Sequence, residues 1–330
     1  MEFRDGIYDQ VLTEAAFAAL ADKVSDQSRS VAELTTDDSA ARLADALATQ
    51  LVRILDDLDG KGADKIRRQL DLVNSILVAT RQRLGRTGHD IDAFHDPLQV
   101  LQAIHRTGSA PAYPDTGLAN PWLFTAGRGS PSLLAELRRE LSACEQVDIL
   151  VSFITYSGVR KLIDVLQSAT AFGANQKPRT RIRILTTTYT GATEIRALDE
   201  LATLPGSEIR ISLDGRRTRL HAKAWIFQRA TGFGSAYVGS ANLSGAALLG
   251  GLEWTVKFTE RGQSDLFERA KAHFETLWED NEFQVYDRNN ESHRQALGEA
   301  LRREAGGDLV VRQTFFDLEP KAYQQDMLDS

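Results

Sequence analysis

The spacing of apolar residues changes once along the chain, near residue 130. Before that point, three segments place apolar residues three or four positions apart, which predicts amphipathic helices. These segments are 11–24, 38–58 and 65–84. Residues 1–107 hold no motif that indicates chemistry, so we expect them to form a helical N-terminal region.

The stretch over residues 108–130 interrupts this pattern. It is rich in Pro, Gly and Ser, as in "GSAPAYPDTG". Such composition disfavours regular helices and strands. We therefore expect a linker or an extended crossing segment here.

Short apolar strands alternate with amphipathic helices from residue 131 onward. The expected strands are 146–154, 180–189, 207–213, 223–227, 235–240 and 256–259, with helices at 130–144, 158–172, 191–204 and 263–280. Strands that alternate with helices of this length predict a layered α/β domain. We place this domain at 131–290, and a C-terminal helix with a further linker at 291–330.

Composition narrows the class of protein. The chain is 42% hydrophobic and 26% charged, as is typical of soluble globular proteins. Its net charge of -7 argues against a uniformly basic surface. The net charge does not exclude a local basic patch, because nucleic-acid binding follows the local field. Cys144 is the single cysteine, which excludes a disulfide within the chain and favours a reducing compartment. No segment resembles a signal peptide or a membrane span, so we expect a cytoplasmic protein.

Four polar residues stand out against the apolar strands that carry them. His221 and Lys223 are two positions apart and so share one side of a strand; Ser240 and Asn242 do the same at the end of the next strand. Ammonium, amide and hydroxyl groups bind the non-bridging oxygens of a phosphate. A neutral histidine attacks phosphorus or moves a proton near pH 7. The set therefore indicates phosphate chemistry.

Further residues near this set have two interpretations each. Glu253 is a candidate to hold the second ring nitrogen of the histidine, or is a solvated acid at the start of a strand. Arg217 and Arg219 are candidates for phosphate contacts beside the site, or form a solvated charge run. The Thr187 hydroxyl either lines a substrate groove or satisfies the local backbone.

The segments "LHAKAWIF", "YVGSANLS" and "GLEW" resemble the signature of the phospholipase D superfamily, in which His-x-Lys precedes Gly-Ser-x-Asn and an acidic residue. The resemblance implies a mixed β-sheet flanked by helices and a phosphohistidine intermediate on His221. It implies that Lys223 and Asn242 bind the phosphate, that Ser240 assists and that Glu253 orients the histidine. Neither a metal nor another cofactor is implied.

The sequence departs from this family pattern in two respects. Gln228 stands where the family often has an aspartate, five residues after the lysine. The motif also occurs once, whereas the family chemistry uses two histidines. Single-motif members of the family pair across a two-fold axis, so we expect a homodimer with both copies of His221 at its interface.

A wider resemblance covers most of the chain. Segments such as "VDILVSFITYSGVRKL" and "RIRILTTTYTGATEIRALDEL" resemble the nuclease module that precedes the motor of some bacterial DEAD/DEAH-type (superfamily 2) helicases. The segment "LEPKAYQQDMLDS", with Pro320, Tyr323 and Gln324, resembles the opening of such a motor. No G-x-x-x-x-G-K-[ST] motif occurs, so we expect no ATP site in these 330 residues and a motor in a longer protein.

The expected function is a metal-independent DNA endonuclease that serves a helicase, with restriction or anti-phage defence as its suggested setting. One alternative keeps the fold without the chemistry, as a DNA-binding or dimerising module. A phospholipid hydrolase is disfavoured, because no apolar interfacial helix or lipid anchor is evident.

Overall fold

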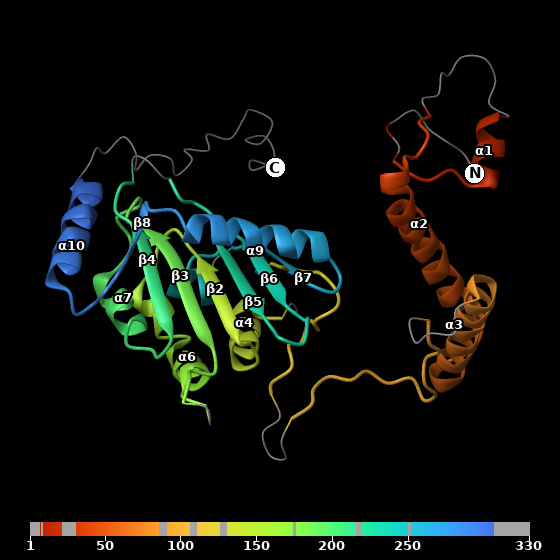
Figure 1. The fold of residues 1–330 in the computed structure, drawn as a ribbon, viewed down its shortest axis with the longest axis horizontal. Coiled ribbons are helices and arrows are strands. Elements are labelled where there is room, and N and C mark those ends of the chain that lie inside the picture. Colours follow the sequence, from red (N-terminus) through yellow and green to blue (C-terminus); the bar gives the residue numbers. More distant parts are fainter. Residues whose placement is uncertain are drawn as a thin grey trace, which may run out of the picture. The chain divides into compact units, whose positions relative to one another are not determined.

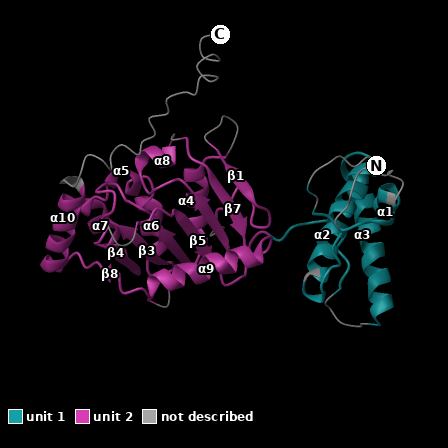
Figure 2. Cartoon of the chain, turned by 90° about the horizontal axis from the view of Figure 1, so that it is seen from above, with its two compact units in different colours: residues 1–101 teal, residues 102–330 magenta. Residues whose placement is uncertain are grey.

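The computed structural model describes residue 7 and residues 9–21, 31–85, 91–105, 111–125, 131–173, 176–215, 219–249 and 252–306. The chain divides into two compact units, residues 1–101 and 102–330 (Figure 2).

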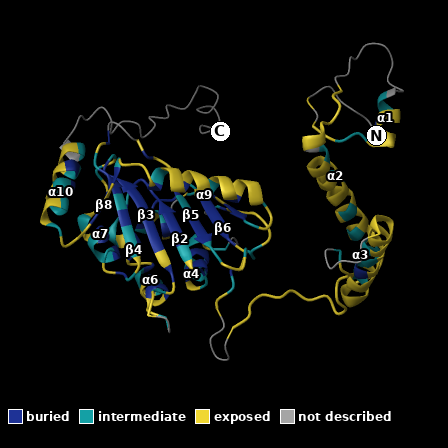
Figure 3. Ribbon diagram, in the orientation of Figure 1, coloured by how far each residue is buried: buried dark blue, intermediate teal, exposed yellow. Residues whose placement is uncertain are grey.

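The first unit is helical, as its apolar spacing predicts. It contains α1 (Glu14–Ala21), α2 (Thr36–Asp57) and α3 (Gly62–Leu84). Helix α3 ends at Gly85, whose φ of 60° is a left-handed conformation that glycine adopts without a Cβ clash. Much of α2 and α3 is exposed (Figure 3), and Ala16 and Leu70 are the buried apolar residues among those described in this unit.

The second unit is built on one eight-stranded sheet (Figure 1). Its strands are β1 (Trp122–Phe124), β2 (Gln146–Leu150), β3 (Arg181–Thr187), β4 (Ser207–Ser212), β5 (Ala224–Gln228), β6 (Ser235–Gly239), β7 (Thr255–Thr259) and β8 (Phe283–Val285). They lie in the order β1-β7-β6-β5-β2-β3-β4-β8. Strands β2, β3 and β4 are parallel and the other pairs are antiparallel, so the predicted mixed α/β fold is confirmed.

Helices cover both faces of this sheet. The helices of this unit are α4 (Leu133–Ser142), α5 (Tyr156–Val159), α6 (Ile163–Thr170), α7 (Ile195–Leu201), α8 (Gly245–Leu249), α9 (Ser264–Trp278) and α10 (Glu291–Gly306). Figure 1 shows α9 lying across one face, where Phe267, Phe274 and Trp278 pack on the strands. On the other face α4, α6 and α7 contribute leucines to a larger core. Strand β2 is buried from both sides, and its Val147, Ile149 and Leu150 pack in the core while the buried Asp148 pairs with Arg183.

The segment expected as a linker or an extended crossing segment contributes to the sheet. Its residues Trp122–Phe124 form the edge strand β1, which pairs with β7. Upstream of that strand, the Lys257 ammonium on β7 donates to the Thr116 hydroxyl at 2.9 Å and to the Gly117 carbonyl at 2.7 Å. Composition favoured a linker because Pro and Gly interrupt periodicity, but the buried lysine supplies a tertiary reason for ordering this segment.

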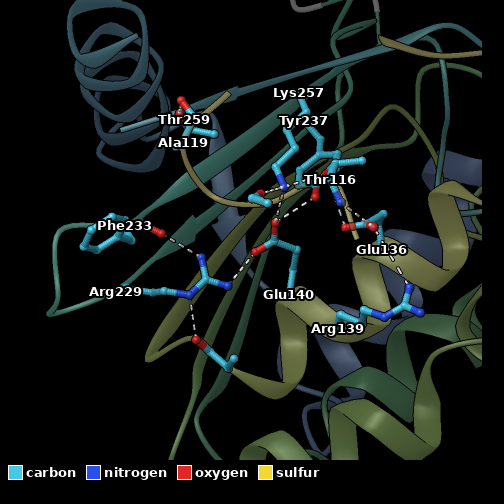
Figure 4. Close-up of polar contacts among 12 residues, drawn as sticks. Thr116, Ala119, Glu136, Arg139, Glu140, Arg229, Phe233, Tyr237, Lys257 and Thr259 are labelled. Atoms are coloured by element: carbon cyan, nitrogen blue, oxygen red, sulfur yellow. Dashed lines mark hydrogen bonds and ion pairs between the residues drawn. The ribbon is translucent and has the colours of Figure 1, made fainter. Parts of the chain in front are cut away.

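A buried ionic network fixes α4 to three strands or their ends (Figure 4). The Glu140 carboxylate on α4 lies 2.5 Å from the Arg229 guanidinium and 3.1 Å from the Lys257 ammonium. The Tyr237 hydroxyl donates to the same carboxylate at 2.7 Å. Burial opposes the charged form of Glu140, but the two cations outweigh it and hold its pKa below the usual value. We call Glu140, Arg229, Tyr237 and Lys257 the Glu140 network.

The helix expected after residue 290 belongs to the α/β unit. Helix α10 packs Leu297 and Ala300 against that unit, and both side chains are buried. Among the described residues, no helix combines the length and the apolar character that crossing a bilayer requires.

Candidate active site

The start of β5 and the end of β6 lie side by side, because the two strands are antiparallel neighbours. The Gly239 N–H donates to the Lys223 carbonyl oxygen at 3.1 Å, just before β5 begins. His221 precedes this point, while Ser240 and Asn242 follow the end of β6. The structure therefore brings the four predicted residues to one end of the strands β5 and β6, which we call the site edge of the sheet.

One detail differs from the prediction. The His-x-Lys segment was expected on a strand, but β5 begins only at Ala224. Strand β6 ends at Gly239, so residues before Lys223 have no ladder partner on that side. His221 consequently lies in the irregular segment that leads into the strand.

Lys223 is nearly buried, with 4% of its surface exposed. Its ammonium donates to the His221 carbonyl oxygen at 2.6 Å, and it lines a cavity of about 10 Å³ together with Leu133, Trp225 and Tyr237. Burial lowers the pKa of Lys223, and the charge of Glu253 partly opposes that shift. An ammonium has three donors, so this contact leaves donor capacity for an anion.

His221 is exposed at the same edge. Partial desolvation and then the nearby charge of Lys223 hold the pKa of His221 below its usual value. A lowered pKa keeps the imidazole neutral at pH 7. The neutral ring is the form that can attack phosphorus or accept a proton.

The Asn242 side chain is held by the loop after β2. Its Oδ1 accepts from the Ser152 N–H at 3.1 Å and from the Phe153 N–H at 3.3 Å. Because Oδ1 is held by these two N–H groups, the Nδ2 donor of the same amide points away from them. Sequence reasoning missed these two main-chain donors, because they lie near Asn242 only through the antiparallel pairing of β2 with β5, which no local pattern encodes.

Ser240 connects the site to the segment before β7. Its hydroxyl donates to the Glu253 carboxylate and accepts from the Trp254 N–H at 3.1 Å. Its own N–H donates to the Trp254 carbonyl at 3.0 Å. Glu253 thus contacts Ser240, whereas the family resemblance implies a contact with His221.

The three predicted substrate-binding residues have different placements. Arg217 lies outside the described residues. Arg219 is exposed, with its guanidinium 6.0 Å from the centre of the Tyr189 ring. Thr187 is fully buried and its hydroxyl accepts from the Tyr189 N–H at 3.1 Å, so this side chain satisfies backbone and does not face a groove.

Gln228 lies at the opposite end of β5 from Lys223. Five residues of extended strand span roughly 16 Å, which is too far for direct contact with a phosphate at His221. The Gln228 amide donates to the Asp148 carboxylate at 2.5 Å, and Arg183 donates to the same carboxylate at 2.7 Å. A glutamine suits this position because a second carboxylate would face Asp148.

The residues at the ends of these strands supply the chemical groups that cleavage of a phosphodiester requires. His221 offers a neutral nitrogen, Lys223 a cation, and Asn242 an amide donor held from behind by main-chain N–H groups. Donors fixed in advance stabilise charge as it grows on phosphate oxygens. Among the described residues, no group of three His, Cys, Asp or Glu side chains is placed to hold a metal ion.

No protein-family model matches the sequence, and no curated protein is significantly similar to it. Distant likeness to solved structures exists. NucT from Helicobacter pylori is 16% identical, with a TM-score of 0.39 over 51% of this chain and 99% of that one. Nuc from Salmonella typhimurium, a phospholipase D family member, is 18% identical, with a TM-score of 0.37 and the same two coverages.

A third likeness covers more of the chain. TrmBL2, an archaeal chromatin protein whose structure shows a novel mode of DNA binding, is 11% identical with a TM-score of 0.30. It covers 74% of this chain and 70% of that one. Likeness at this level does not identify an activity, so the functional argument depends on the residues of the site.

Proposed function

We propose that the protein is a metal-independent phosphodiesterase of the phospholipase D type, acting on DNA through a phosphohistidine on His221. The observation that carries this proposal is the convergence of His221, Lys223 and Asn242 at one sheet edge, with the asparagine amide clamped by the Ser152 and Phe153 N–H groups. The motif order "HAK…GSAN…E" supports the family assignment.

In the proposed first step, a neutral ring nitrogen of His221 attacks phosphorus. The N–P bond forms as the P–O bond to the leaving strand breaks, and the leaving oxygen takes a proton from a second imidazole ring. The two facing rings titrate as a pair that shares one proton, so one ring is neutral while the other is charged. Lys223 and the Asn242 amide bind the non-bridging oxygens as their charge grows. Ser240 holds the Trp254 backbone beside them.

In the proposed second step, water attacks the phosphohistidine and the N–P bond breaks. The second imidazole, now neutral, takes the proton from this water and is thereby reset. We assign that imidazole to His221 of a second copy, because the chain carries one His-x-Lys motif. A homodimer with the two sites facing each other satisfies this requirement.

The choice of DNA, and the role as the nuclease module of a helicase, rest on the wider sequence resemblance described above. A defence or restriction setting is the further expectation from that arrangement. The contact between Glu253 and Ser240 favours the alternative of a DNA-binding or dimerising module, because it leaves His221 without the carboxylate partner that the family resemblance implies.

The deciding experiment incubates the chain with supercoiled plasmid and with single-stranded DNA in EDTA. Wild type should cut, and should form an acid-labile protein–DNA adduct of the kind expected for an N–P bond. His221→Ala should lose both properties while folding and sedimenting as wild type does. His273→Ala, at an exposed histidine on α9, is the matched control and should behave as wild type.

Cutting that survives His221→Ala would overturn the assignment of the nucleophile. A strict requirement for magnesium would overturn the metal-free scheme. An active monomer would overturn the assignment of the second imidazole. Tight DNA binding without turnover of DNA or of a model diester would favour the non-catalytic alternative.

A further inference from the structure

An exposed tryptophan lies directly beside the site. Trp254 has 66% of its surface exposed, although a tryptophan of a folded protein is usually well covered. Its neighbour Leu252 is 91% exposed. The proposed chemistry uses neither side chain, so their exposure requires a separate explanation.

The backbone of Trp254 is anchored at the catalytic edge. Its N–H donates to the Ser240 hydroxyl at 3.1 Å and its carbonyl accepts from the Ser240 N–H at 3.0 Å. Strands β6 and β7 approach so closely here that a Cβ on Gly239 would lie 2.1 Å from the Trp254 carbonyl oxygen. The backbone of Trp254 is thus tied to Ser240, next to the phosphate-binding residues.

An aromatic ring close to phosphate-binding residues indicates which class of ligand this surface suits. A polynucleotide presents a base close to each phosphate, and every base has a π-face that stacks on an aromatic ring. An indole beside phosphate donors therefore suits a nucleobase better than it suits a bare phosphate. A base paired in a duplex has both faces covered by its neighbours and is not available for this contact.

We propose that Trp254 is a stacking platform for an unpaired base of the DNA strand whose phosphate lies at His221. This inference rests on the proposed function and specifies its substrate, namely single-stranded or locally unpaired DNA. Stacking is tolerant of sequence, so the platform selects strand state and not base identity.

The test measures binding in the His221→Ala background, so that the strand is not cut. A labelled oligothymidylate, the same backbone with abasic residues, and a duplex of equal length serve as probes. Trp254→Ala should weaken oligothymidylate binding roughly 5- to 150-fold, the range found when a stacked aromatic is removed. Binding of the abasic strand and of the duplex should stay unchanged, and Trp254→Phe should retain most of the affinity.

Trp122→Ala is the matched control, because Trp122 is also exposed, at 42%, but lies on β1 opposite Lys257. Equal weakening for all three probes would overturn the stacking role, and so would unchanged oligothymidylate binding. Loss of self-association in sedimentation, with strand binding intact, would place Trp254 at an interface between copies and overturn the proposal.

The two proposals fail in different ways. Cleavage that depends on His221, with no effect of Trp254→Ala on strand binding, would overturn the platform alone. Strand binding that depends on Trp254, without any cleavage, would overturn the catalytic proposal alone.

Discussion

Two nearly buried lysines in the α/β unit have opposite surroundings. The Lys257 ammonium contacts the Glu140 carboxylate, the Thr116 hydroxyl and the Gly117 carbonyl, so all three of its donors are used. The Lys223 ammonium contacts the carbonyl of His221 and lies beside an apolar cavity. Tyr237 takes part in both environments, since it lines that cavity and donates to Glu140.

The difference separates a structural cation from one suited to bind a ligand. A buried charge is tolerated when it is paired and its donors are satisfied, as in the Glu140 network. Lys223 keeps donor capacity at the sheet edge, and burial lowers its pKa. We therefore expect changes in the Glu140 network to affect stability and changes around Lys223 to affect catalysis.

The largest expected effect comes from Glu140→Ala. This change leaves Arg229 and Lys257 buried without their carboxylate, which should lower the free energy of unfolding by about 3–5 kcal/mol. Urea denaturation measures the loss. Asp164→Ala is the matched control, because it removes the exposed pair with Arg138 and should cost less than about 1 kcal/mol.

The pH dependence of this stability has a defined sign. The pKa of Glu140 is lowered in the folded state, so its contribution is present above the usual value of 4.5 and is lost as pH falls through the folded pKa. The stability gap between wild type and Glu140→Ala should narrow in acid. An equal loss for Glu140→Ala and Asp164→Ala would remove the distinction between buried and exposed pairs.

A second test exchanges the two lysines in turn for methionine. Lys223→Met should lower the rate of DNA cleavage by roughly 10²–10³-fold, because it removes a group that stabilises charge in the transition state. Lys257→Met should leave the rate per folded molecule unchanged but destabilise the fold by roughly 3 kcal/mol. Single-turnover cleavage and urea denaturation of both variants measure the two outcomes.

The pH profile gives the lysine exchange a second readout. Because the pKa of His221 is held below 6.5, the acid limb of kcat/KM for wild type should lie below that value. In Lys223→Met the limb should move towards 6.5, since desolvation remains but the cationic neighbour is gone. Matching rates and profiles for the two methionine variants would show that the lysines do not differ in role.

The smallest effect is expected from Gln228→Asp, which introduces the residue that the resemblance to the phospholipase D superfamily leads one to expect at this position. The new carboxylate would face Asp148, so the free energy of unfolding should fall by about 1–2 kcal/mol. Cleavage per folded molecule should not rise, because this end of β5 is far from the site. A marked gain in activity would show that the aspartate acts in catalysis and that its absence weakens this protein.

Some features followed directly from local sequence. Apolar spacing predicted the helices at 38–58 and 65–84 close to where α2 and α3 lie, and alternation of strands and helices predicted the α/β unit. Trp225 and Phe227, on the strand expected at 223–227, are buried in the core. The order of His221, Lys223, Ser240 and Asn242 along a hairpin was enough to place them at one sheet edge.

Other features could not be anticipated from neighbouring residues. The strand β1 forms in a segment rich in Pro and Gly because it pairs with β7. The Lys257 ammonium also donates to the Gly117 carbonyl just before this strand. Thr187 was a candidate for substrate contact, yet it is buried and its hydroxyl accepts from the Tyr189 N–H.

The sequence by itself determined which chemical groups are present and which of them share a strand end, because periodicity and turns act over a few residues. Only the tertiary structure decided how those groups are used. The clamp on Asn242 comes from the end of β2, the partner of Gln228 is Asp148 on β2, and the partner of Ser240 is Glu253 before β7. Such contacts join residues far apart in the chain, so they depend on strand order and register, which no local pattern encodes.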